Sequence, residues 1–336
     1  MRPLLITPGD PAGIGPEIAL KALARHDDLR AKTVLMGDQD HLQDIADHLG
    51  ISVSFALWKP SYACQAGAIN LYPIDWAETV VAGQPDSANS PQVIDAIKQA
   101  VTLTQKGHAA GIVTCPIAKS VLYDVGFAYP GHTEYLESLS SSGRSIMMLA
   151  NDQLKVIPAT IHIPLHDVPK SLSTDALYSL IIQTARALTS QFGITTPRIA
   201  LCGLNPHAGE NGAMGREEMT IVSPAIKQAQ DALGTDASIS GPHAADSLFH
   251  PEKRSAFDCV IGMYHDQVLI PVKTIDFHGS VNVTLGLDFI RTSPDHGTAF
   301  DIAGKNLAKE DSLINAIKMA DQMAQNSEIV SKEPRS

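Results

Sequence analysis

The amino-acid sequence predicts a mixed α/β fold, and three observations support this class. Short runs rich in β-branched and other apolar residues recur along the chain, each bounded by Gly, Pro or Asp, as is typical of buried parallel strands. Stretches with a helical spacing of apolar residues lie between these runs. Because strands and helices alternate, we expect a sheet covered by helices, with ligands bound beyond the carboxyl ends of the strands.

The strand candidates are short and apolar, and each is bounded on at least one side by Gly, Pro or Asp. Strands of this length and composition fit the buried interior of a sheet. The five clearest candidates are residues 4–7, 33–36, 111–114, 198–202 and 258–263.

The helix candidates are marked by their ends as well as by their apolar period. Ser90 and Pro91 can provide an N-cap and a first-turn proline, and Gly107 can end that helix. A polar tail with frayed structure is expected at residues 325–336. Three further stretches have the same punctuation or period: 177–193, closed by Gly193, 223–234, and 313–320.

Length and composition indicate a soluble globular protein of about two domains. The chain has 336 residues, of which 44% are hydrophobic and 18% charged, as in ordinary folded proteins. The net charge of −11 disfavours nucleic acid and anionic membranes as partners. No apolar run approaches the roughly 20 residues that cross a membrane, and no targeting segment is visible. The four cysteines form no CxxC pair, and a cytoplasmic location is expected.

Three histidines follow strand-like runs and are candidate metal ligands: His162, His207 and His265. Their separations of 45 residues (207 − 162) and 58 residues (265 − 207) fit one ligand from each strand-and-helix segment. Imidazole nitrogen suits Zn²⁺ and neighbouring divalent ions, and three protein ligands leave a position open for substrate. Asp246 or Asp266 could accept the second ring N–H of a ligating histidine.

Hydrogen-bonded loop histidines are the alternative interpretation of this pattern. Spacing along a sequence does not show that side chains converge, so a shared metal site and separate structural roles both stay open. Other histidines compete as ligands on the same grounds: His166, His243, His278 and His296.

A glycine-rich segment, residues 7–17, follows the first strand candidate and opens a helix. Its glycines run G-x-x-x-G-x-G, which does not match the dinucleotide-binding fingerprint or a P-loop. Asp10 and Glu17 would also repel a pyrophosphate at that helix terminus. We therefore interpret the segment as a rigid turn more than as a phosphate cradle. Asp38, after the second strand candidate, could bind a ribose, although a capping role is favoured.

Five further polar residues are candidates for binding an anionic substrate. His132 and Thr133 follow a Tyr-Pro-Gly turn and could donate to a phosphate or carboxylate, although the chemistry alone favours an ordinary turn with Thr133 as a helix N-cap. Lys273, Asn282 and Arg291 are single polar residues in apolar surroundings. A charge in such a place needs an anionic partner, either an acidic side chain or a ligand.

The order of several motifs along the chain resembles the 4-hydroxythreonine-4-phosphate dehydrogenase family. The segments that carry the resemblance are 8–17, 114–119, 129–134, 203–210, 263–267 and 282–297. Matching the family's motifs implies metal ligands at His162, His207 and His265. It also implies substrate contacts, at His132, Thr133, Lys273, Asn282 and Arg291.

The resemblance further implies a fold similar to isocitrate and isopropylmalate dehydrogenases, not a Rossmann fold. Two α/β/α subdomains, residues 1–128 with 290–336 and residues 129–289, would enclose a cleft, and a homodimer would form each site at the subunit interface. The implied reaction oxidises 4-phosphooxy-L-threonine with NAD or NADP to 2-amino-3-oxo-4-phosphooxybutanoate. That acid decarboxylates to 3-amino-2-oxopropyl phosphate, in vitamin B6 biosynthesis.

Several choices stay open at this point. A divalent metal, Zn²⁺, Mg²⁺ or Co²⁺, would assist the oxidation, and Asp246 or Asp266 could remove the proton. Relatives with similar histidines oxidise erythronate or threonate 4-phosphate or cyclic dihydrodiols. A metal-dependent phosphatase or hydrolase would need no nicotinamide, and a phosphate-binding module would bind without turnover.

Overall fold

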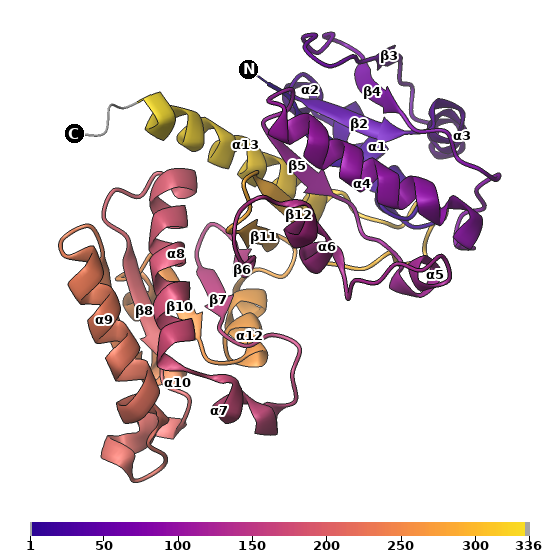
Figure 1. Cartoon of the computed structure of the whole chain (residues 1–336). Coiled ribbons are helices and arrows are strands. Elements are labelled where there is room, and N and C mark those ends of the chain that lie inside the picture. Colours follow the sequence, from indigo (N-terminus) through magenta and orange to yellow (C-terminus); the bar gives the residue numbers. More distant parts are fainter. Residues whose placement is uncertain (1, 333–336) are drawn as a thin grey trace. The chain divides into compact units, whose positions relative to one another are not determined.

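The structure is a computed structural model that describes residues 2–332 of the chain. The chain divides into two compact units (Figure 1). The first comprises Met1–Ser145 and Leu287–Ala324, and the second comprises Ile146–Gly286 and Gln325–Ser336. The subdomain boundaries expected from the sequence, 128/129 and 289/290, stay a prediction.

The sheet of the first unit has the strand order β3-β4-β2-β1-β5-β12, and each neighbouring pair is parallel. The strands are β1 (Leu4–Thr7), β2 (Thr33–Gly37), β3 (Phe55–Leu57), β4 (Ile69–Pro73), β5 (Gly111–Thr114) and β12 (Arg291–Pro294). The helices are α1 (Gly15–Arg25), α2 (Asp27–Arg30), α3 (Gln39–Leu49), α4 (Ser90–Gln105), α5 (Lys119–Tyr123) and α6 (His132–Leu139), with a 3-10 turn η1 (Ser87–Asn89). The strands predicted at β1, β2 and β5 are confirmed.

Apolar side chains from the central strands and α4 form the core of the first unit. Leu5 of β1, Val34 of β2 and Ile112 of β5 are fully buried. Helix α4 crosses this sheet (Figure 1) and buries Val93 and Ile97, four residues apart on one face. The carboxyl ends of β1, β5 and β12 therefore lie beside one another at one edge of a well-packed sheet.

The N-terminus of α4 differs from the prediction by one residue. Ser90 is the first helical residue and not the N-cap, which is Asn89. The amide of Asn89 instead accepts a bond of 3.0 Å from the backbone N–H of Glu78, and the Ser90 hydroxyl donates to the carbonyl of Val121. Gly107 follows the helix with a φ of 76°, so the predicted end is confirmed.

The sheet of the second unit has the strand order β11-β6-β7-β10-β8-β9. The pairs β11-β6 and β6-β7 are antiparallel, whereas β7-β10, β10-β8 and β8-β9 are parallel. The strands are β6 (Ile146–Ala150), β7 (Lys155–Pro158), β8 (Arg198–Cys202), β9 (Ser238–His243), β10 (Cys259–Gly262) and β11 (Val281–Leu285). The strands predicted at β8 and β10 are confirmed.

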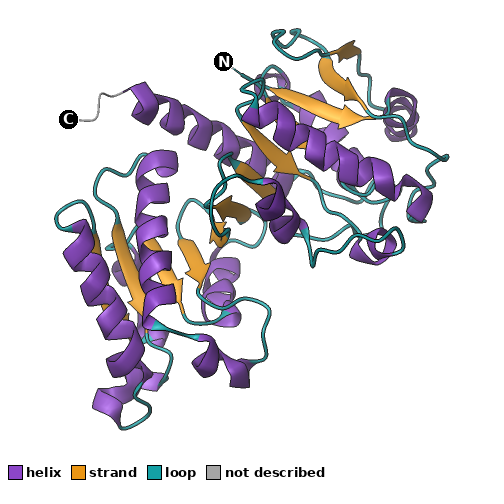
Figure 2. Ribbon diagram, viewed as in Figure 1, coloured by secondary structure: helices purple, strands orange, loops and turns teal. Residues whose placement is uncertain are grey.

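The helices of the second unit flank this sheet, and α8 and α9 lie side by side across one face (Figures 1 and 2). They are α7 (Val168–Ser171), α8 (Thr174–Phe192), α9 (Ser223–Leu233), α10 (Ala245–Leu248), α11 (Pro251–Arg254) and α12 (His265–Ile275), together with the turns η2 (Leu165–Asp167), η3 (Pro206–Gly212) and η4 (Glu218–Val222). Gly193 ends α8 with a φ of 69°, as predicted. Ser223 is not an N-cap, because the π-helical turn η4 runs directly into α9.

The last helix, α13 (Asp311–Lys332), corrects the prediction of a frayed tail from residue 325. Residues 325–332 continue the helix, and side chains there contact the end of α8. Asn326 donates 3.0 Å to the carbonyl of Gln191, and Ser327 donates 3.2 Å to the carbonyl of Ser190. The remainder of the predicted tail, residues 333–336, lies outside the described residues.

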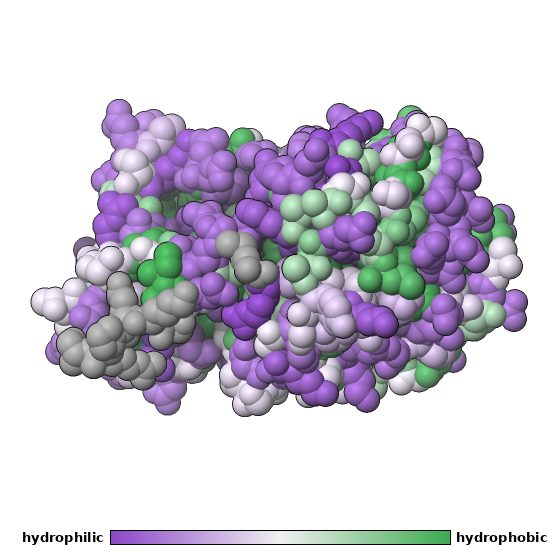
Figure 3. Space-filling model, turned by 90° about the horizontal axis from the view of Figure 1, so that it is seen from above, coloured by the Kyte–Doolittle hydropathy of each residue, from purple (hydrophilic) through white to green (hydrophobic). Residues whose placement is uncertain are grey.

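The face shown in Figure 3 is mostly hydrophilic, and hydrophobic side chains gather on its right-hand side. Within residues 2–332, no helix is long and apolar enough to cross a membrane.

Candidate active site

The three candidate metal ligands follow three neighbouring strands of the second unit. His162 lies in the loop after β7, His265 begins α12 directly after β10, and His207 lies in η3 after β8. The strands β7, β10 and β8 are adjacent and parallel, so their carboxyl ends share one edge of the sheet. This is the edge at which open α/β sheets bind ligands.

Hydrogen bonds tie these three loops together. The hydroxyl of Thr160, near His162, donates 2.8 Å to the carbonyl of Met263 after β10. The side chain of Gln267, on the first turn of α12, accepts 2.7 Å from the N–H of Met263 and donates 2.7 Å to the carbonyl of Gly203 after β8. The backbone that carries the histidines is therefore cross-linked in a single network.

Two of the three imidazoles lie close together in one chain. The ring centres of His162 and His265 are 5.7 Å apart, and Nδ1 of His265 lies 2.7 Å from Oδ1 of Asp266. That contact leaves Nε2 of His265 to face a ligand, the usual arrangement of a metal-binding histidine with a carboxylate behind it. Within residues 2–332 of one chain, no three His, Cys, Asp or Glu side chains converge closely enough to hold a metal ion.

The segment that carries His207 is a left-handed turn. Residues 207–211 have φ values of 52°, 51°, 77°, 42° and 55°, and only Gly209 among them is a glycine. Left-handed backbone costs roughly 1–2 kcal/mol for each L-residue with a side chain. Strain of this kind is found at functional sites and persists only where the surrounding structure imposes it.

A buried carboxylate supplies that surrounding structure. Glu218, at the start of η4, is 2% exposed. Its Oε1 accepts 2.7 Å from the backbone N–H of Asn205, and its Oε2 accepts 3.1 Å from the Asn205 side chain. A Cβ atom on Gly209 would lie 2.5 Å from Oε2 of Glu218. The turn is therefore folded tightly around the Glu218 carboxylate.

The four competing histidines have local partners or lie elsewhere. His166 is exposed beside Asp167, and Nε2 of His243 lies 2.9 Å from the Ser240 hydroxyl. The ring of His278 packs edge-on against its neighbour Phe277. His296 belongs to the first unit, where its Nδ1 lies 3.0 Å from the carbonyl of Gly297.

Two of the substrate candidates also lie in the second unit. Lys273 lies on α12 and Asn282 lies on β11. The Nζ atom of Lys273 is 5.6 Å from the ring centre of Phe277. The side-chain oxygen of Asn282 is buried without a hydrogen-bond partner. An unpartnered buried amide oxygen is costly, and a ligand N–H or O–H would satisfy it.

Helix α12 borders two hollows in the surface of the second unit. One, of about 420 Å³, is lined by His265, Asp266 and Lys273 among others. The other, of about 540 Å³, is lined by Asp246 and again by Asp266. Both candidate proton acceptors and one candidate metal ligand thus face open space large enough for a small molecule.

The remaining substrate candidates lie in the first unit. His132 and Thr133 are the first two residues of α6, and the N-cap is Gly131, so the alternative role of Thr133 as N-cap is wrong. Nε2 of His132 is buried without a partner. Burial, together with the nearby charges of Arg291 and Lys119, lowers the pKa of His132 well below its usual 6.5. The imidazole is therefore neutral at neutral pH.

Arg291 is a buried cation that donates hydrogen bonds to a threonine hydroxyl. It begins β12, is 3% exposed, and donates from Nε (3.2 Å) and Nη2 (2.7 Å) to the hydroxyl of Thr114. Thr114 ends the adjacent strand β5 and is fully buried. Burial lowers the pKa of Arg291 to about 10, so the guanidinium stays charged at neutral pH. Thr114 therefore orients the guanidinium group.

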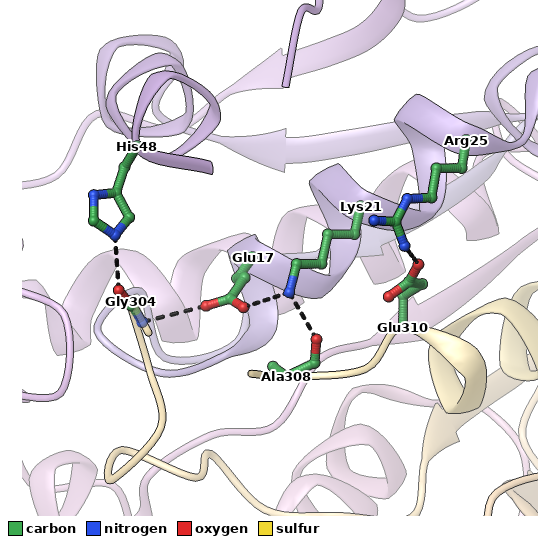
Figure 4. A network of polar contacts seen from close by, with 7 residues as sticks. All are labelled: Glu17, Lys21, Arg25, His48, Gly304, Ala308 and Glu310. Carbon is green, nitrogen blue, oxygen red and sulfur yellow. Dashed lines mark hydrogen bonds and ion pairs between the residues drawn. The ribbon is translucent and has the colours of Figure 1, made fainter. Parts of the chain in front are cut away.

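The glycine-rich turn after β1 is closed by packing. A Cβ atom on Gly9 would lie 2.3 Å from the Pro116 carbonyl, and Gly9 has a φ of 70°. The buried Glu17 accepts from Nζ of Lys21 (2.7 Å) and from the backbone N–H of Gly304 (3.2 Å), as Figure 4 shows. Lys21 also donates to the carbonyl of Ala308. The turn therefore joins α1 to the segment before α13.

Two other acidic groups near this turn have structural partners. Asp38 is the N-cap of α3, where it accepts 3.1 Å from the N–H of His41 and 3.3 Å from that of Trp76. Asp10 is buried and accepts 3.0 Å from the N–H of Ala12, and burial raises the pKa of its carboxyl group. The capping role favoured for Asp38 is confirmed.

Several proteins that are similar to this chain over nearly its whole length are named as dehydrogenases. The family model described as pyridoxal phosphate biosynthetic protein PdxA matches residues 29–320, and the chain belongs to this family. The prediction of the family from sequence motifs is thereby confirmed, and so is the mixed α/β class.

Three similar proteins illustrate the relationship. A 4-hydroxythreonine-4-phosphate dehydrogenase from Ruegeria sp. (strain TM1040) is 50% identical over 321 residues, which cover 94% of this chain and 95% of that protein. The crystal structure of 4-hydroxythreonine-4-phosphate dehydrogenase from Klebsiella pneumoniae is 37% identical with a TM-score of 0.88, covering 97% of this chain and 100% of that one. A terephthalate 1,2-cis-dihydrodiol dehydrogenase from Burkholderia xenovorans LB400 is 28% identical with a TM-score of 0.67, covering 96% and 98%.

Three polar residues of the candidate site were not singled out from the sequence: Thr114, Lys119 and Glu218. Thr114 and Lys119 are the first and last residues of the segment 114–119, which carries part of the family resemblance. That position in the segment was the signal that could have identified them. Glu218 stands beside Glu217, and nothing in the sequence distinguishes the buried acid from its more exposed neighbour.

Proposed function

We propose that this chain oxidises 4-phosphooxy-L-threonine to 2-amino-3-oxo-4-phosphooxybutanoate, with NAD⁺ or NADP⁺ accepting the hydride. The product acid then loses CO₂ and gives 3-amino-2-oxopropyl phosphate, in vitamin B6 biosynthesis. The observation that carries the proposal is similarity over nearly the full length to enzymes named for this substrate. The position of the three histidines after neighbouring parallel strands supports it.

His162, His207 and His265 would hold a divalent metal ion. Imidazole donors fit Zn²⁺ and Co²⁺ well, while Mg²⁺ prefers oxygen ligands and would rely on substrate and water as well. When bound, such an ion supplies Lewis acidity at the hydroxyl oxygen that is oxidised. The contact between His265 and Asp266 fixes one imidazole with Nε2 outward, as a metal site requires.

The anionic and polar groups of the substrate would be bound by five residues. Arg291 and Lys273 provide positive charge, and guanidinium groups suit phosphate and carboxylate oxygens in particular. The unpartnered Nε2 of His132 and the unpartnered amide oxygen of Asn282 would gain hydrogen bonds from the ligand. Thr133, on the first turn of α6, would donate its hydroxyl.

A carboxylate would take the proton from the substrate hydroxyl. Asp266 and Asp246 are the candidates, and both line the 540 Å³ hollow beside α12. Asp266 is already bound to the ring of His265, whereas Asp246 is exposed on α10. Activity that survives Asp246→Asn and is lost with Asp266→Asn would assign the base to Asp266, and the reverse would assign it to Asp246.

The proposal includes a homodimer with each site at the subunit interface. The rings of His162 and His265 lie close together within one chain, whereas His207 follows the neighbouring strand β8. A second subunit would supply the ligand that completes a group of three histidines. Ile270 and Phe277, on and just after α12, are 63% and 62% exposed beside the candidate residues. Burying such side chains favours association. The four cysteines are free thiols, as the expected cytoplasm would keep them.

One second candidate function has specific support. The similarity to a named dihydrodiol dehydrogenase suggests oxidation of a cyclic dihydrodiol by the same fold. Erythronate or threonate 4-phosphate shares with 4-phosphooxy-L-threonine the phosphate group and a hydroxyl group that can be oxidised. The buried guanidinium of Arg291 suits an anionic substrate, since guanidinium groups bind phosphate and carboxylate oxygens alike.

The direct test is nicotinamide reduction by the purified protein with each of these substrates in turn. Reduction of NAD⁺ or NADP⁺ with 4-phosphooxy-L-threonine, at a kcat/KM well above that for the other substrates, would support the proposal. Reduction only with a sugar-acid phosphate or a dihydrodiol would reassign the substrate. Release of inorganic phosphate without nicotinamide reduction would instead indicate a phosphatase.

A further inference from the structure

The left-handed turn after β8 has a single buried carboxylate at its centre. Among residues 207–211, four have side chains and yet adopt positive φ values. The turn is not stabilised by its own sequence, because those residues prefer right-handed or extended backbone. Something outside the turn must impose its conformation, and Glu218 is the group placed to do so.

Glu218 reaches the turn through both carboxylate oxygens. Oε1 and Oε2 accept from the backbone and side-chain N–H groups of Asn205, at 2.7 and 3.1 Å. Asn205 is the N-cap position of η3 and lies two residues before His207. The carboxylate also faces Gly209 and leaves no room for a Cβ atom there. Both sides of His207 are therefore held by one side chain.

The charge of Glu218 is matched by N–H donors and not by a cation. Within the described residues it forms no ion pair, although it is 2% exposed. A buried carboxylate that accepts hydrogen bonds from amide groups holds those groups in place. If one of these donors moved away, the buried charge would lose a hydrogen bond, which is costly. Its neighbour Glu217 also accepts from the Asn205 side chain, at 2.9 Å, but is less buried.

We infer that Glu218 is a positioning residue that holds the left-handed turn so that His207 faces a divalent cation. This inference rests on the proposed function, because it takes His207 as a metal ligand. Glu218 does not touch the cation and acts only through the backbone on either side of His207. Supporting partners of metal ligands typically contribute about 10- to 100-fold to metal affinity.

The test compares Glu218→Gln with Glu217→Gln in the full-length protein after removal of metal. The two substitutions make the same chemical change at adjacent positions, but only the first alters the buried acceptor. We expect Glu218→Gln to weaken Zn²⁺ binding by about 10- to 100-fold and Glu217→Gln to leave it within a few-fold. Excess Zn²⁺ should restore turnover to Glu218→Gln. The visible absorption of bound Co²⁺, which reports ligand geometry, should change only in Glu218→Gln.

A purely structural role predicts a different result. Thr184 is buried in α8 and donates its hydroxyl 2.7 Å to the carbonyl of Leu180, away from the turn. Thr184→Val should lower the melting temperature without changing Zn²⁺ affinity. If Glu218→Gln behaves in the same way, with a lower melting temperature and wild-type Zn²⁺ affinity and Co²⁺ spectrum, the inference is wrong.

Gly209→Ala tests the same contact from the opposite side, and it serves if Glu218→Gln does not fold. Its Cβ atom would meet the Glu218 carboxylate, so Zn²⁺ affinity should fall, and the effect should be smaller in a Glu218→Ala background where the carboxylate is absent. Equal effects in both backgrounds would contradict the inference. The proposed metal site is tested separately, by comparing Zn²⁺ binding in the wild type and in His207→Ala. If both bind Zn²⁺ equally, the proposed site is wrong, and this outcome is distinct from a failure of the Glu218 inference.

Discussion

Two glycine-rich turns follow buried strands in this chain, and a buried glutamate lies at each of them with a different partner. After β1, Glu17 is paired with Lys21, and the glycines pack against neighbouring backbone. After β8, Glu218 is bound by Asn205, and the turn carries His207 in left-handed backbone. The first turn has its charge neutralised internally. The second is strained and presents a polar side chain, which is the arrangement expected of a ligand site.

The difference shows that glycine content alone is a poor sign of a binding loop. Gly9 allows two backbone segments to approach closely, whereas Gly209 makes room for a carboxylate. The useful distinction is whether strained, left-handed backbone in a turn presents a side chain that can bind a ligand. On this criterion we assign the turn after β1 to stability and the turn after β8 to function, and four predictions test that assignment.

The largest effect is expected at His207. Replacement by Ala should reduce turnover to background, because a proposed metal ligand is lost, while the fold stays intact. Metal content after dialysis, turnover and circular dichroism together check this result. His166→Ala is the matched control, since His166 is exposed beside Asp167 and does not belong to the proposed ligand set. Full turnover of His207→Ala in metal-free buffer would contradict the assignment.

Breaking the buried pair of the first turn should affect stability and not function. Lys21→Met leaves Glu17 buried without its cation, which typically costs about 3–5 kcal/mol. Denaturant unfolding measures the loss, and the substrate KM should be unchanged. The exposed pair between Arg25 and Glu310 is the control, and Glu310→Gln should cost about 0–1 kcal/mol. A raised KM without a loss of stability in Lys21→Met would move this turn into the site.

Within the first unit, we expect residues of β5 and β12 to affect substrate binding and residues of the glycine-rich turn not to affect it. Thr114→Val removes the hydroxyl that orients Arg291, and a bond to a charged group is worth about 1.5–3 kcal/mol, or roughly 10- to 100-fold in KM. Thr114→Ser should restore wild-type KM. Thr292→Val removes a buried hydroxyl that donates to the carbonyl of Ala316 and should change only stability. Equal KM values in the two valine variants would contradict this expectation.

The smallest effect concerns the pH dependence of stability through His132. Its pKa is lowered in the folded protein, by burial first and then by Arg291 and Lys119. Below pH 6.5 the unfolded chain therefore binds a proton that the folded chain does not, so acidification favours unfolding. Both proteins are measured in the presence of a chelator. When the pH is lowered from above to below 6.5, the melting temperature of His132→Gln should fall less than that of the wild type. Parallel curves for the two proteins would contradict the role of burial.

The sequence predicted the fold well where the signal is local. The strand candidates at β1, β2, β5, β8 and β10 are found because short apolar runs bounded by turn residues are local features. Helix starts were less predictable: Ser90 and Thr133 both lie inside the helices that they were candidates to cap. A cap depends on backbone angles and on partners from other segments, as the bond between Asn89 and Glu78 illustrates.

The candidate site was predictable only in part, for the same reason. The order of strands places His162, His207 and His265 after neighbours in the sheet, and their role as ligands stays a prediction. The contacts of Glu218 with Asn205 and of Thr114 with Arg291 join residues 13 and 177 positions apart. Periodicity does not reveal pairs of this kind, because they arise from the way in which the segments fold back on one another.

The measurement that tests the account most directly is turnover of 4-phosphooxy-L-threonine after removal of metal. The wild-type protein is dialysed against a chelator, and nicotinamide reduction is followed before and after addition of Zn²⁺, Mg²⁺ or Co²⁺. We predict that chelation abolishes reduction and that at least one of these ions restores it in wild type but not in His207→Ala. Undiminished reduction in the chelated wild-type protein would contradict the account.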